Sequence, residues 1–278
     1  MKTILVPTEP HDFTTATLDA ALRLARRFDS YVEGFALRSA LAELLAVDPL
    51  SATVLPTADR DDEEAAQQAR QLFESFMRGR GVPRRGAPTA GPSFGWLDEA
   101  PNGDGFVGSY GRVFDITVVG RPDPNRNSPR MSTLEAALFD SGRPILIAPP
   151  TPPPQLGDII VIAWNGSTET ARAVALALPL LERAQRVVVL TIEGWGVPGP
   201  SGEQLTRYLR ANDIAAEPLA VPAGRRNSGE TILANAGSLR CDLLIKGAYT
   251  QSRLRQMIFG GATAHVLAKA EMPVFMAH

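Results

Sequence analysis

Short apolar runs alternate along the whole chain with segments whose apolar residues recur at helical spacing. Two of the runs, Thr3–Pro7 (TILVP) and Asp158–Ala163 (DIIVIA), have the continuous apolar character of strands that are buried on both faces. Each run ends in a short polar turn, TEPHDFT or WNGST, and each turn leads into an amphipathic segment. This alternation predicts βαβ units and a parallel sheet with both faces covered.

The two amphipathic segments predict two helices that follow the two strands. Ser167 stands just before the second helix and is its expected N-cap. The faces expected to be buried follow the spacing i, i+3, i+4, i+7. They consist of Leu18, Ala21, Leu22 and Ala25 in the first helix and of Ala171, Val174, Ala175 and Leu178 in the second.

The second half of the chain repeats the pattern of the first. The apolar runs DITVVG and DLLIKG end at Gly120 and Gly247, which are 127 positions apart. Two proline-led runs, PILIA and PVFMA, begin at Pro144 and Pro273, which are 129 positions apart. Matched apolar runs at a nearly constant offset indicate an internal repeat.

The first half contains extra residues, since the opening strands are offset by 156 positions, more than the later ones. We place this insertion between Leu37 and Phe114. It includes the stretch DDEEAAQQARQLFESFMRGRG, which is acidic at its start and basic at its end. That polarity matches a helix dipole, and Gly79 or Gly81 is the expected end of the helix.

A proline-rich stretch divides the chain nearly in half. Residues 149–155, PPTPPPQ, contain five prolines in seven positions, which neither a helix interior nor a central strand accommodates. We therefore predict an α/β fold of two tandem, doubly wound domains, each with a mostly parallel five-stranded sheet. The predicted domains are residues 1–149, with the inserted helical segment, and residues 156–278, joined by a linker at 150–155.

The composition restricts the partners and the compartment. A formal net charge of −2 provides no electrostatic basis for binding nucleic acid or an anionic membrane. No apolar run approaches the roughly 20 residues that cross a bilayer, and the start of the chain does not resemble a signal peptide. The single cysteine, Cys241, excludes an intramolecular disulfide. These features predict a cytoplasmic protein.

Two glycine motifs match known signatures without the structural context that those signatures require. GWGVPG, Gly194–Gly199, fits the dinucleotide pattern G-x-G-x-x-G, but prolines interrupt the passage into a helix. We interpret it as a loop, and we expect the next helix to begin at Ser201, with Gln204 completing a capping box.

The second motif is GPSFG, Gly91–Gly95, which fits the nucleophile elbow of serine hydrolases. No predicted strand precedes Ser93 and no predicted helix follows it, as that motif requires. His265 is the histidine best placed in chain order for a triad, although packing on a helix is its simpler role. No group of histidine, cysteine and carboxylate residues has the spacing of metal ligands, so neither a metal site nor a catalytic residue is predicted.

The stretch Gly247–Thr263, GAYTQSRLRQMIFGGAT, has glycines at both ends and a basic middle that contains Arg253. It connects a predicted strand with the last helix. The first amides of that helix, at Gly261, Ala262 and Thr263, lack partners within the helix and would attract an anion. The stretch is therefore either a phosphate-binding loop or a plain strand-to-helix connection.

At this stretch the sequence resembles the universal stress protein family, and the resemblance covers nearly the whole chain. The family's nucleotide loop is glycine, two residues, glycine, nine residues, glycine, then serine or threonine. Gly247, Thr250, Gly260 and Gly261 stand at those four positions with the spacing kept. Thr250 replaces the second glycine, and Gly261 replaces the hydroxyl residue that helps to hold the outer phosphates.

The resemblance implies an adenine nucleotide such as ATP, accompanied by Mg²⁺, as the cofactor of the second half. Asn165 takes the place of the aspartate that contacts the nucleoside, and Ile192 matches the position whose backbone meets adenine. The complete set of implied nucleotide-binding residues is Ala163, Asn165, Gly166, Ile192, Gly247, Thr250, Arg253, Gly260, Gly261, Ala262 and Thr263.

The first half departs further from the family's pattern. Glu9 replaces the aspartate, Asp123 replaces the second glycine, and Met131 and Ser132 stand at the third glycine and the hydroxyl. Asp123 would repel a phosphate and Met131 would crowd it, so we interpret this half as a degenerate partner. Family members pair through their last strands, which implies that PILIA and PVFMA pair within this chain. A further homodimer is left open.

Three functions are compatible with the sequence. The first is a stress-response regulator that binds ATP or a related adenine nucleotide in its second half and hydrolyses it slowly or not at all. The second is a nucleotide-free scaffold that acts through dimerisation and protein partners. The third is a serine hydrolase that uses Ser93.

Overall fold

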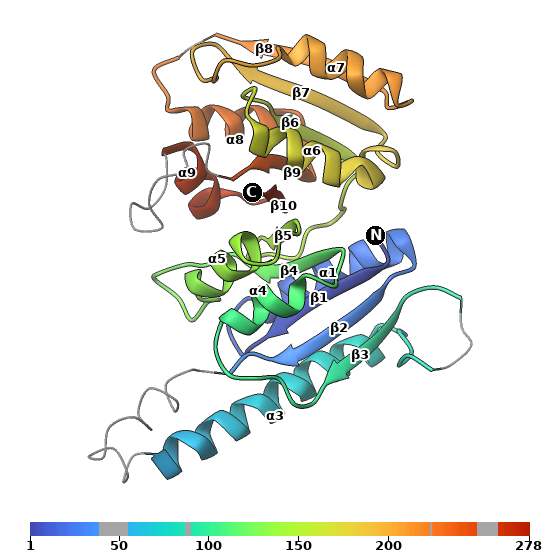
Figure 1. Ribbon diagram of the computed structural model, residues 1–278, viewed down its shortest axis with the longest axis vertical. Coiled ribbons are helices and arrows are strands. Elements are labelled where there is room, and N and C mark those ends of the chain that lie inside the picture. Colours follow the sequence, from blue (N-terminus) through green and yellow to red (C-terminus); the bar gives the residue numbers. More distant parts are fainter. Residues whose placement is uncertain (39–54, 87–89, 223, 249–260) are drawn as a thin grey trace. The chain divides into compact units, whose positions relative to one another are not determined.

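The computed structural model describes residues 1–38, 55–86, 90–222, 224–248 and 261–278 (Figure 1). The chain forms two compact units, Met1–Arg143 and Pro144–His278. We refer to them as unit 1 and unit 2 and describe each by itself. The sequence-based boundaries, with a linker at 150–155, stay a prediction.

Within its described residues, unit 1 contains four strands that pair in the order β3-β2-β1-β4, all parallel. Helices α1 and α3 pack together, as do α4 and α5. The strands are β1 (Thr3–Thr8), β2 (Tyr31–Ala36), β3 (Ser93–Leu97) and β4 (Ile116–Gly120), and the helices are α1 (Thr14–Phe28), α3 (Leu55–Gly79), α4 (Gly105–Gly111) and α5 (Met131–Phe139).

The described part of unit 2 contains six strands in the order β5-β10-β9-β6-β7-β8. All neighbours are parallel except β5 and β10, which pair antiparallel, as predicted for the two proline-led runs. The strands are β5 (Ile145–Ala148), β6 (Ile159–Ala163), β7 (Arg186–Ile192), β8 (Ala216–Val221), β9 (Leu243–Gly247) and β10 (Val274–Ala277). The helices are α6 (Thr168–Leu181), α7 (Gly202–Ala211), α8 (Ser228–Ser238) and α9 (Gly261–Lys269).

The predicted doubly wound α/β fold is confirmed. In each half the chain runs outward from the first strand to its neighbours and then returns to the other side of that strand. Because strand–helix–strand crossovers are right-handed, the returning helices cover the opposite face of the sheet. Both faces of the sheets are therefore covered, and strands β1, β4, β6 and β9 are buried almost throughout.

The extra residues of the first half are only partly an insertion. In the order of elements, α3 and β3 take the places that α7 and β8 have in the second half. They therefore belong to the repeat, and the extra length lies in the 25-residue helix α3, against 10 residues in α7, and in residues 39–54. Residues 39–54 lie outside the described part of the chain. Strand β3 was missed because its run, SFGWL, is short and follows a glycine- and proline-rich stretch.

Local signals placed several helix ends correctly. Ser167 caps α6, with its hydroxyl accepting a hydrogen bond from the backbone N–H of Thr170 at 3.2 Å. Ser201 and Gln204 form the expected capping box at α7, and α3 ends at Gly79. These signals act within one turn of chain, so they can be identified without tertiary structure.

The predicted buried face of α6 is correct at Val174, which is buried, and wrong at its two alanines. Ala171 and Ala175 are exposed, whereas Ala173 and Ala177 are buried. The sequence ARAVALALPLL is apolar at nearly every position, so more than one set of residues has the spacing i, i+3, i+4, i+7. By contrast, all four residues of the predicted face of α1 are buried.

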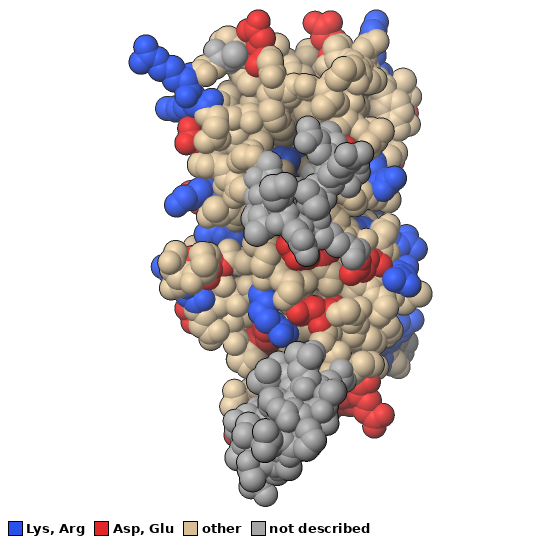
Figure 2. Space-filling view, turned by 60° about the vertical axis from the view of Figure 1, so that its left-hand side comes forward, with Lys and Arg blue, Asp and Glu red and all other residues tan. Residues whose placement is uncertain are grey.

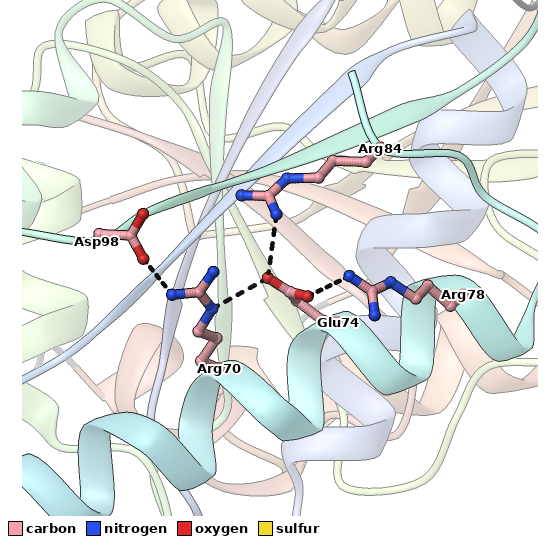
Figure 3. A network of polar contacts seen from close by, with 5 residues as sticks. All are labelled: Arg70, Glu74, Arg78, Arg84 and Asp98. Carbon is pink, nitrogen blue, oxygen red and sulfur yellow. Dashed lines mark hydrogen bonds and ion pairs between the residues drawn. The ribbon is translucent and has the colours of Figure 1, made fainter. Parts of the chain in front are cut away.

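A polar network fastens α3 to the neighbouring strand region (Figure 3). The carboxylate of Glu74, which is buried, pairs with Arg70 at 3.1 Å, Arg78 at 2.6 Å and Arg84 at 3.8 Å. Arg70 also pairs with Asp98, which follows β3. One carboxylate thus connects three arginines, and the network positions α3 rather than forming a site.

The two halves also share a carboxylate clamp at the start of the first strand. In unit 2 the carboxylate of Asp242 accepts hydrogen bonds from the backbone N–H groups of Gly157, Asp158 and Ile159, at 2.9, 3.1 and 3.0 Å. In unit 1 Asp115 accepts from the N–H of Thr3 at 3.0 Å. Each aspartate therefore fixes where the first strand of its half begins.

Figure 2 shows acidic and basic side chains interspersed on the face that it presents. Within the described residues, no helix combines the length and the apolar character that crossing a membrane requires.

Candidate functional site

Several of the predicted site residues lie at one edge of the unit 2 sheet. Strands β9, β6 and β7 are neighbours and run parallel, so their carboxyl ends meet at that edge. Ala163, Ile192 and Gly247 are the last residues of these strands, and α9 begins at Gly261. Thr250, Arg253 and Gly260 lie outside the described residues.

The turn between β6 and α6 holds Asn165 in the helix cap. Its side-chain oxygen accepts hydrogen bonds from the hydroxyl of Thr170 at 2.7 Å and from the N–H of Ser167 at 3.2 Å. The bond from Ser167 closes the short turn that an asparagine side chain commonly forms with the backbone N–H two residues further on. The oxygen that would replace the family's aspartate is therefore already engaged in positioning α6.

The glycine-rich loop GWGVPG packs directly over this turn. The N–H of Val197 donates to the carbonyl of Asn165 at 2.9 Å, and the indole N–H of Trp164 donates to the carbonyl of Pro200 at 2.8 Å. A Cβ at Gly199 would lie 2.3 Å from the carbonyl oxygen of Gly166. The glycines thus permit close contact of two backbone segments, which confirms that GWGVPG is a loop and not the start of a helix.

Ile192 lies at the end of β7 beside this loop and is buried. Its carbonyl accepts a hydrogen bond from the N–H of Trp195 at 3.1 Å. The backbone carbonyl of Ile192 is therefore already used in a tight turn.

Gly247 lacks a side chain because α6 packs against it. A Cβ at this position would lie 2.4 Å from the backbone nitrogen of Thr170 and 2.7 Å from the carbonyl carbon of Glu169. Such distances to backbone atoms cannot be relieved by rotating a side chain. The first glycine of the predicted loop is accordingly required by packing, whether or not a nucleotide approaches it.

Sequence reasoning missed the most unusual residue at this edge, Lys246. Its side chain is 5% exposed, and its ammonium group donates to the hydroxyl of Thr263 at 2.7 Å and to the carbonyl of Gly247 at 2.9 Å. No carboxylate pairs with it among the described residues. The available signal was a charged residue inside the apolar run LLIKG, since a lysine is seldom buried without a partner.

Burial lowers the pKa of Lys246 to about 8, from an ordinary value near 10.5. The unfolded chain therefore binds a proton on Lys246 more tightly than the folded chain does. The positive charge favours unfolding, and this effect is complete below pH 8. We expect Lys246→Met to raise the free energy of unfolding at pH 7 by about 2 kcal/mol, after the lost hydrogen bonds are subtracted. The gain should be smaller at pH 10, where the lysine is mostly neutral in the folded state, and should vanish only above about pH 11, where it becomes neutral in both states.

Denaturant titrations at pH 7 and pH 10 measure this effect. Lys269 in α9 is exposed, so Lys269→Met is the matched control and should leave stability unchanged at both values. An equal gain for Lys246→Met at both pH values would assign it to apolar packing instead of charge.

The corresponding edge of unit 1 carries the opposite charges. Arg130 lies between two carboxylates, 3.6 Å from Glu9 and 3.4 Å from Asp104. Thr133, the third residue of α5, donates its hydroxyl to Asp104 at 2.7 Å. Burial raises the pKa of Glu9, against the lowering effect of Arg130. This edge therefore carries two carboxylates against one guanidinium group, which leaves it with a net negative charge.

The other candidate residues have structural roles. Ser93 is the first residue of β3, paired with β2, and not the apex of a strand-to-helix turn. His265 packs against α8, where a Cβ at Gly229 would lie 2.6 Å from the Cβ of His265. Cys241 is buried, and burial raises the pKa of its thiol to about 12. No group of metal-ligating side chains occurs within the described residues.

Comparisons with solved structures identify the fold. Over 99% of this chain and 95% of the other, the structure resembles a universal stress protein from Archaeoglobus fulgidus DSM 4304, with a TM-score of 0.70 and 15% identity. A putative universal stress protein from Pseudomonas aeruginosa UCBPP-PA14 has a TM-score of 0.55 and 14% identity, covering 100% of this chain and 93% of its own. A protein of unknown function from Pseudomonas aeruginosa PAO1 has a TM-score of 0.53 and 14% identity, with coverages of 100% and 92%.

The chain therefore has the fold of universal stress proteins along its whole length. No protein-family model and no curated protein matches the sequence. At identities of 14–15% the likeness applies to the architecture, and the chemistry of the site has to be argued from the residues themselves.

Proposed function

We propose that this chain is a universal stress protein whose second half binds ATP or a related adenine nucleotide and thereby regulates a stress response. The observation that carries the proposal is the coincidence of two independent features. The fold is that of universal stress proteins, and the loop spacing Gly247, Thr250, Gly260, Gly261 stands at the expected place in it, between β9 and α9.

Electrostatics favours unit 2 over unit 1 as the nucleotide site. The edge of unit 2 combines the start of α9, which has no acidic residue in its first turn, with the cation of Lys246. The edge of unit 1 carries Glu9 and Asp104, which would repel a phosphate. One nucleotide per chain is the expected stoichiometry.

Gly261→Val tests the site without disturbing the fold. Gly261 is exposed, and a Cβ there would meet no atom of the described residues within 4 Å, so the variant should be as stable as the wild type. A branched side chain at the first turn of α9 would nevertheless obstruct a phosphate that approaches the amides. We expect ATP affinity, measured by calorimetry, to fall at least about tenfold, which corresponds to about 1.4 kcal/mol.

Gly237→Val is the matched control, because Gly237 is an exposed glycine of α8 with no atom within 4 Å of a Cβ. It should bind ATP like the wild type. Unchanged affinity of Gly261→Val would show that the nucleotide, if bound, lies elsewhere.

A nucleotide-free scaffold is the second candidate, and one observation favours it. Packing against α6 by itself accounts for Gly247, and the hydroxyl of Thr263 is already engaged by Lys246. The absence of both heat and thermal stabilisation when wild-type protein is titrated with millimolar ATP would select this candidate. The hydrolase alternative has no support in the position of Ser93, and a cytoplasmic location and a homodimer stay predictions from the sequence.

A further inference from the structure

The edge of unit 2 contains a buried positive charge that no described acidic group neutralises. Lys246 is nine-tenths or more buried and, among the described residues, donates to two neutral oxygens, those of Thr263 and Gly247. The segment 249–260 that joins β9 to α9 contains no aspartate or glutamate, whatever its conformation. A buried ammonium group without an anionic partner is costly, and natural proteins retain one where it has a ligand.

The nearest helix adds to this positive potential. Thr263 is the third residue of α9, so Lys246 lies beneath the first turn of that helix, where free N–H groups carry partial positive charge. No acidic residue occurs in this turn. Glu169 belongs to α6, which packs on the Gly247 face of β9. Because side chains alternate along a strand, Lys246 points to the opposite face.

The comparison with unit 1 shows that the charge is specific to unit 2. Both halves have a threonine as the third residue of the helix that precedes the last strand, Thr133 in α5 and Thr263 in α9. In unit 1 that hydroxyl binds the carboxylate of Asp104, which Arg130 neutralises. In unit 2 the hydroxyl binds a cation, and no described carboxylate completes the pair. The same position in the fold therefore pairs the threonine with a carboxylate in unit 1 and with a cation in unit 2.

We propose that Lys246, the hydroxyl of Thr263 and the first amides of α9 form an oxyanion subsite that binds a phosphate group. If the proposed function holds, this phosphate belongs to the adenine nucleotide. Lys246 would then supply a donor in place of the family's hydroxyl residue, which Gly261 lacks. The ammonium group has three N–H bonds, two of which donate to described protein oxygens, and the proposal assigns the third to the phosphate.

Lysine also suits this role better than arginine would. The chain contains only three lysines, Lys2, Lys246 and Lys269, although lysine and arginine together number 28. An ammonium group is compact and rotates freely, whereas a guanidinium group requires a planar set of acceptors and more room. Burial lowers the pKa of Lys246 to about 8, so the group is mainly charged at neutral pH even before an anion arrives.

The test measures the binding of three probes, inorganic tripolyphosphate, ATP and adenosine, by calorimetry at pH 7. We expect Lys246→Met to weaken the binding of tripolyphosphate and of ATP by about 10- to 100-fold, the usual contribution of a hydrogen bond from a charged donor. Adenosine lacks phosphate, so its affinity should not change. Lys269→Met, which removes an exposed lysine from the same unit, should bind all three probes like the wild type.

A second variant separates the subsite from a general loss of charge. Thr263→Val keeps the shape of the buried side chain and removes the hydroxyl that orients Lys246. We expect it to weaken tripolyphosphate binding by roughly threefold to tenfold, with the thermal unfolding profile retained. Unaltered tripolyphosphate affinity in both Lys246→Met and Thr263→Val would overturn the proposal.

The probes also distinguish this proposal from the proposed function. If Lys246→Met binds ATP as tightly as the wild type does, the subsite proposal is wrong and the nucleotide-binding function is retained. Wild-type protein that binds tripolyphosphate through Lys246, but ATP no better than tripolyphosphate, would support the subsite and contradict adenine recognition. No binding of tripolyphosphate or ATP to the wild type would overturn both.

Discussion

Replacing Asp242 by alanine should lower the free energy of unfolding by about 3 kcal/mol, since it leaves partly buried donors without an acceptor. The carboxylate accepts three backbone hydrogen bonds, from Gly157, Asp158 and Ile159, all within 3.1 Å. These residues lead into β6, which occupies the centre of the unit 2 sheet between β9 and β7. Water can reach the donors only in part, so most of the loss should be measurable by urea denaturation.

Two variants control this experiment. Glu271→Ala removes an exposed carboxylate from the same unit and should change stability by less than about 0.5 kcal/mol. Asp242→Asn keeps one acceptor oxygen but turns an NH₂ group toward a backbone N–H, so its loss should be nearly as large. A loss below about 0.5 kcal/mol for Asp242→Ala would mean that water replaces the carboxylate and that the clamp does not fix the strand.

Gly247→Ala should destabilise the protein by about 3 kcal/mol, at the upper end of what overpacking usually costs. The added methyl group would lie 2.4 Å from the backbone nitrogen of Thr170 and 2.6 Å from its hydroxyl oxygen. Relief would require α6 to move away from β9. Such a shift would disturb the cap that Ser167 and Asn165 build at the start of α6.

Gly237→Ala is the control for this prediction. It lies exposed in α8 with open space around a Cβ, so alanine there should raise the free energy of unfolding by about 0.5–1 kcal/mol through helix propensity. Chemical denaturation of both variants measures the difference. If Gly247→Ala were as stable as the wild type, glycine at this position would be explained by a ligand and not by the packing of α6.

The local parts of this fold were predictable because their causes are local. Strand β6 is a continuous apolar run, and Ser167 and the pair Ser201–Gln204 cap helices within a single turn. The resemblance to the universal stress protein family, which rests on the order and spacing of residues, implied that β5 and β10 would pair. Such evidence depends on residue order alone.

The misses have a common origin in contacts between residues far apart in the sequence. The helix α6 carries several equivalent apolar faces, and only the position of the sheet selects Ala173 and Ala177 over Ala171 and Ala175. Strand β3 is short and becomes a strand by pairing with β2. In both cases propensity was too weak to decide, and tertiary packing decided.

The sequence by itself determined the order of strands and helices, the repeat and the glycine spacing that resembles a nucleotide loop. The tertiary structure alone decided which contacts the candidate site residues make at the two sheet edges. It engages Asn165 and Gly247 in positioning α6, and it neutralises Arg130 between Glu9 and Asp104 in unit 1. It also buries the cation of Lys246 in unit 2 beside Thr263. Charge balance at a site depends on which side chains meet in space, and residue order does not specify that.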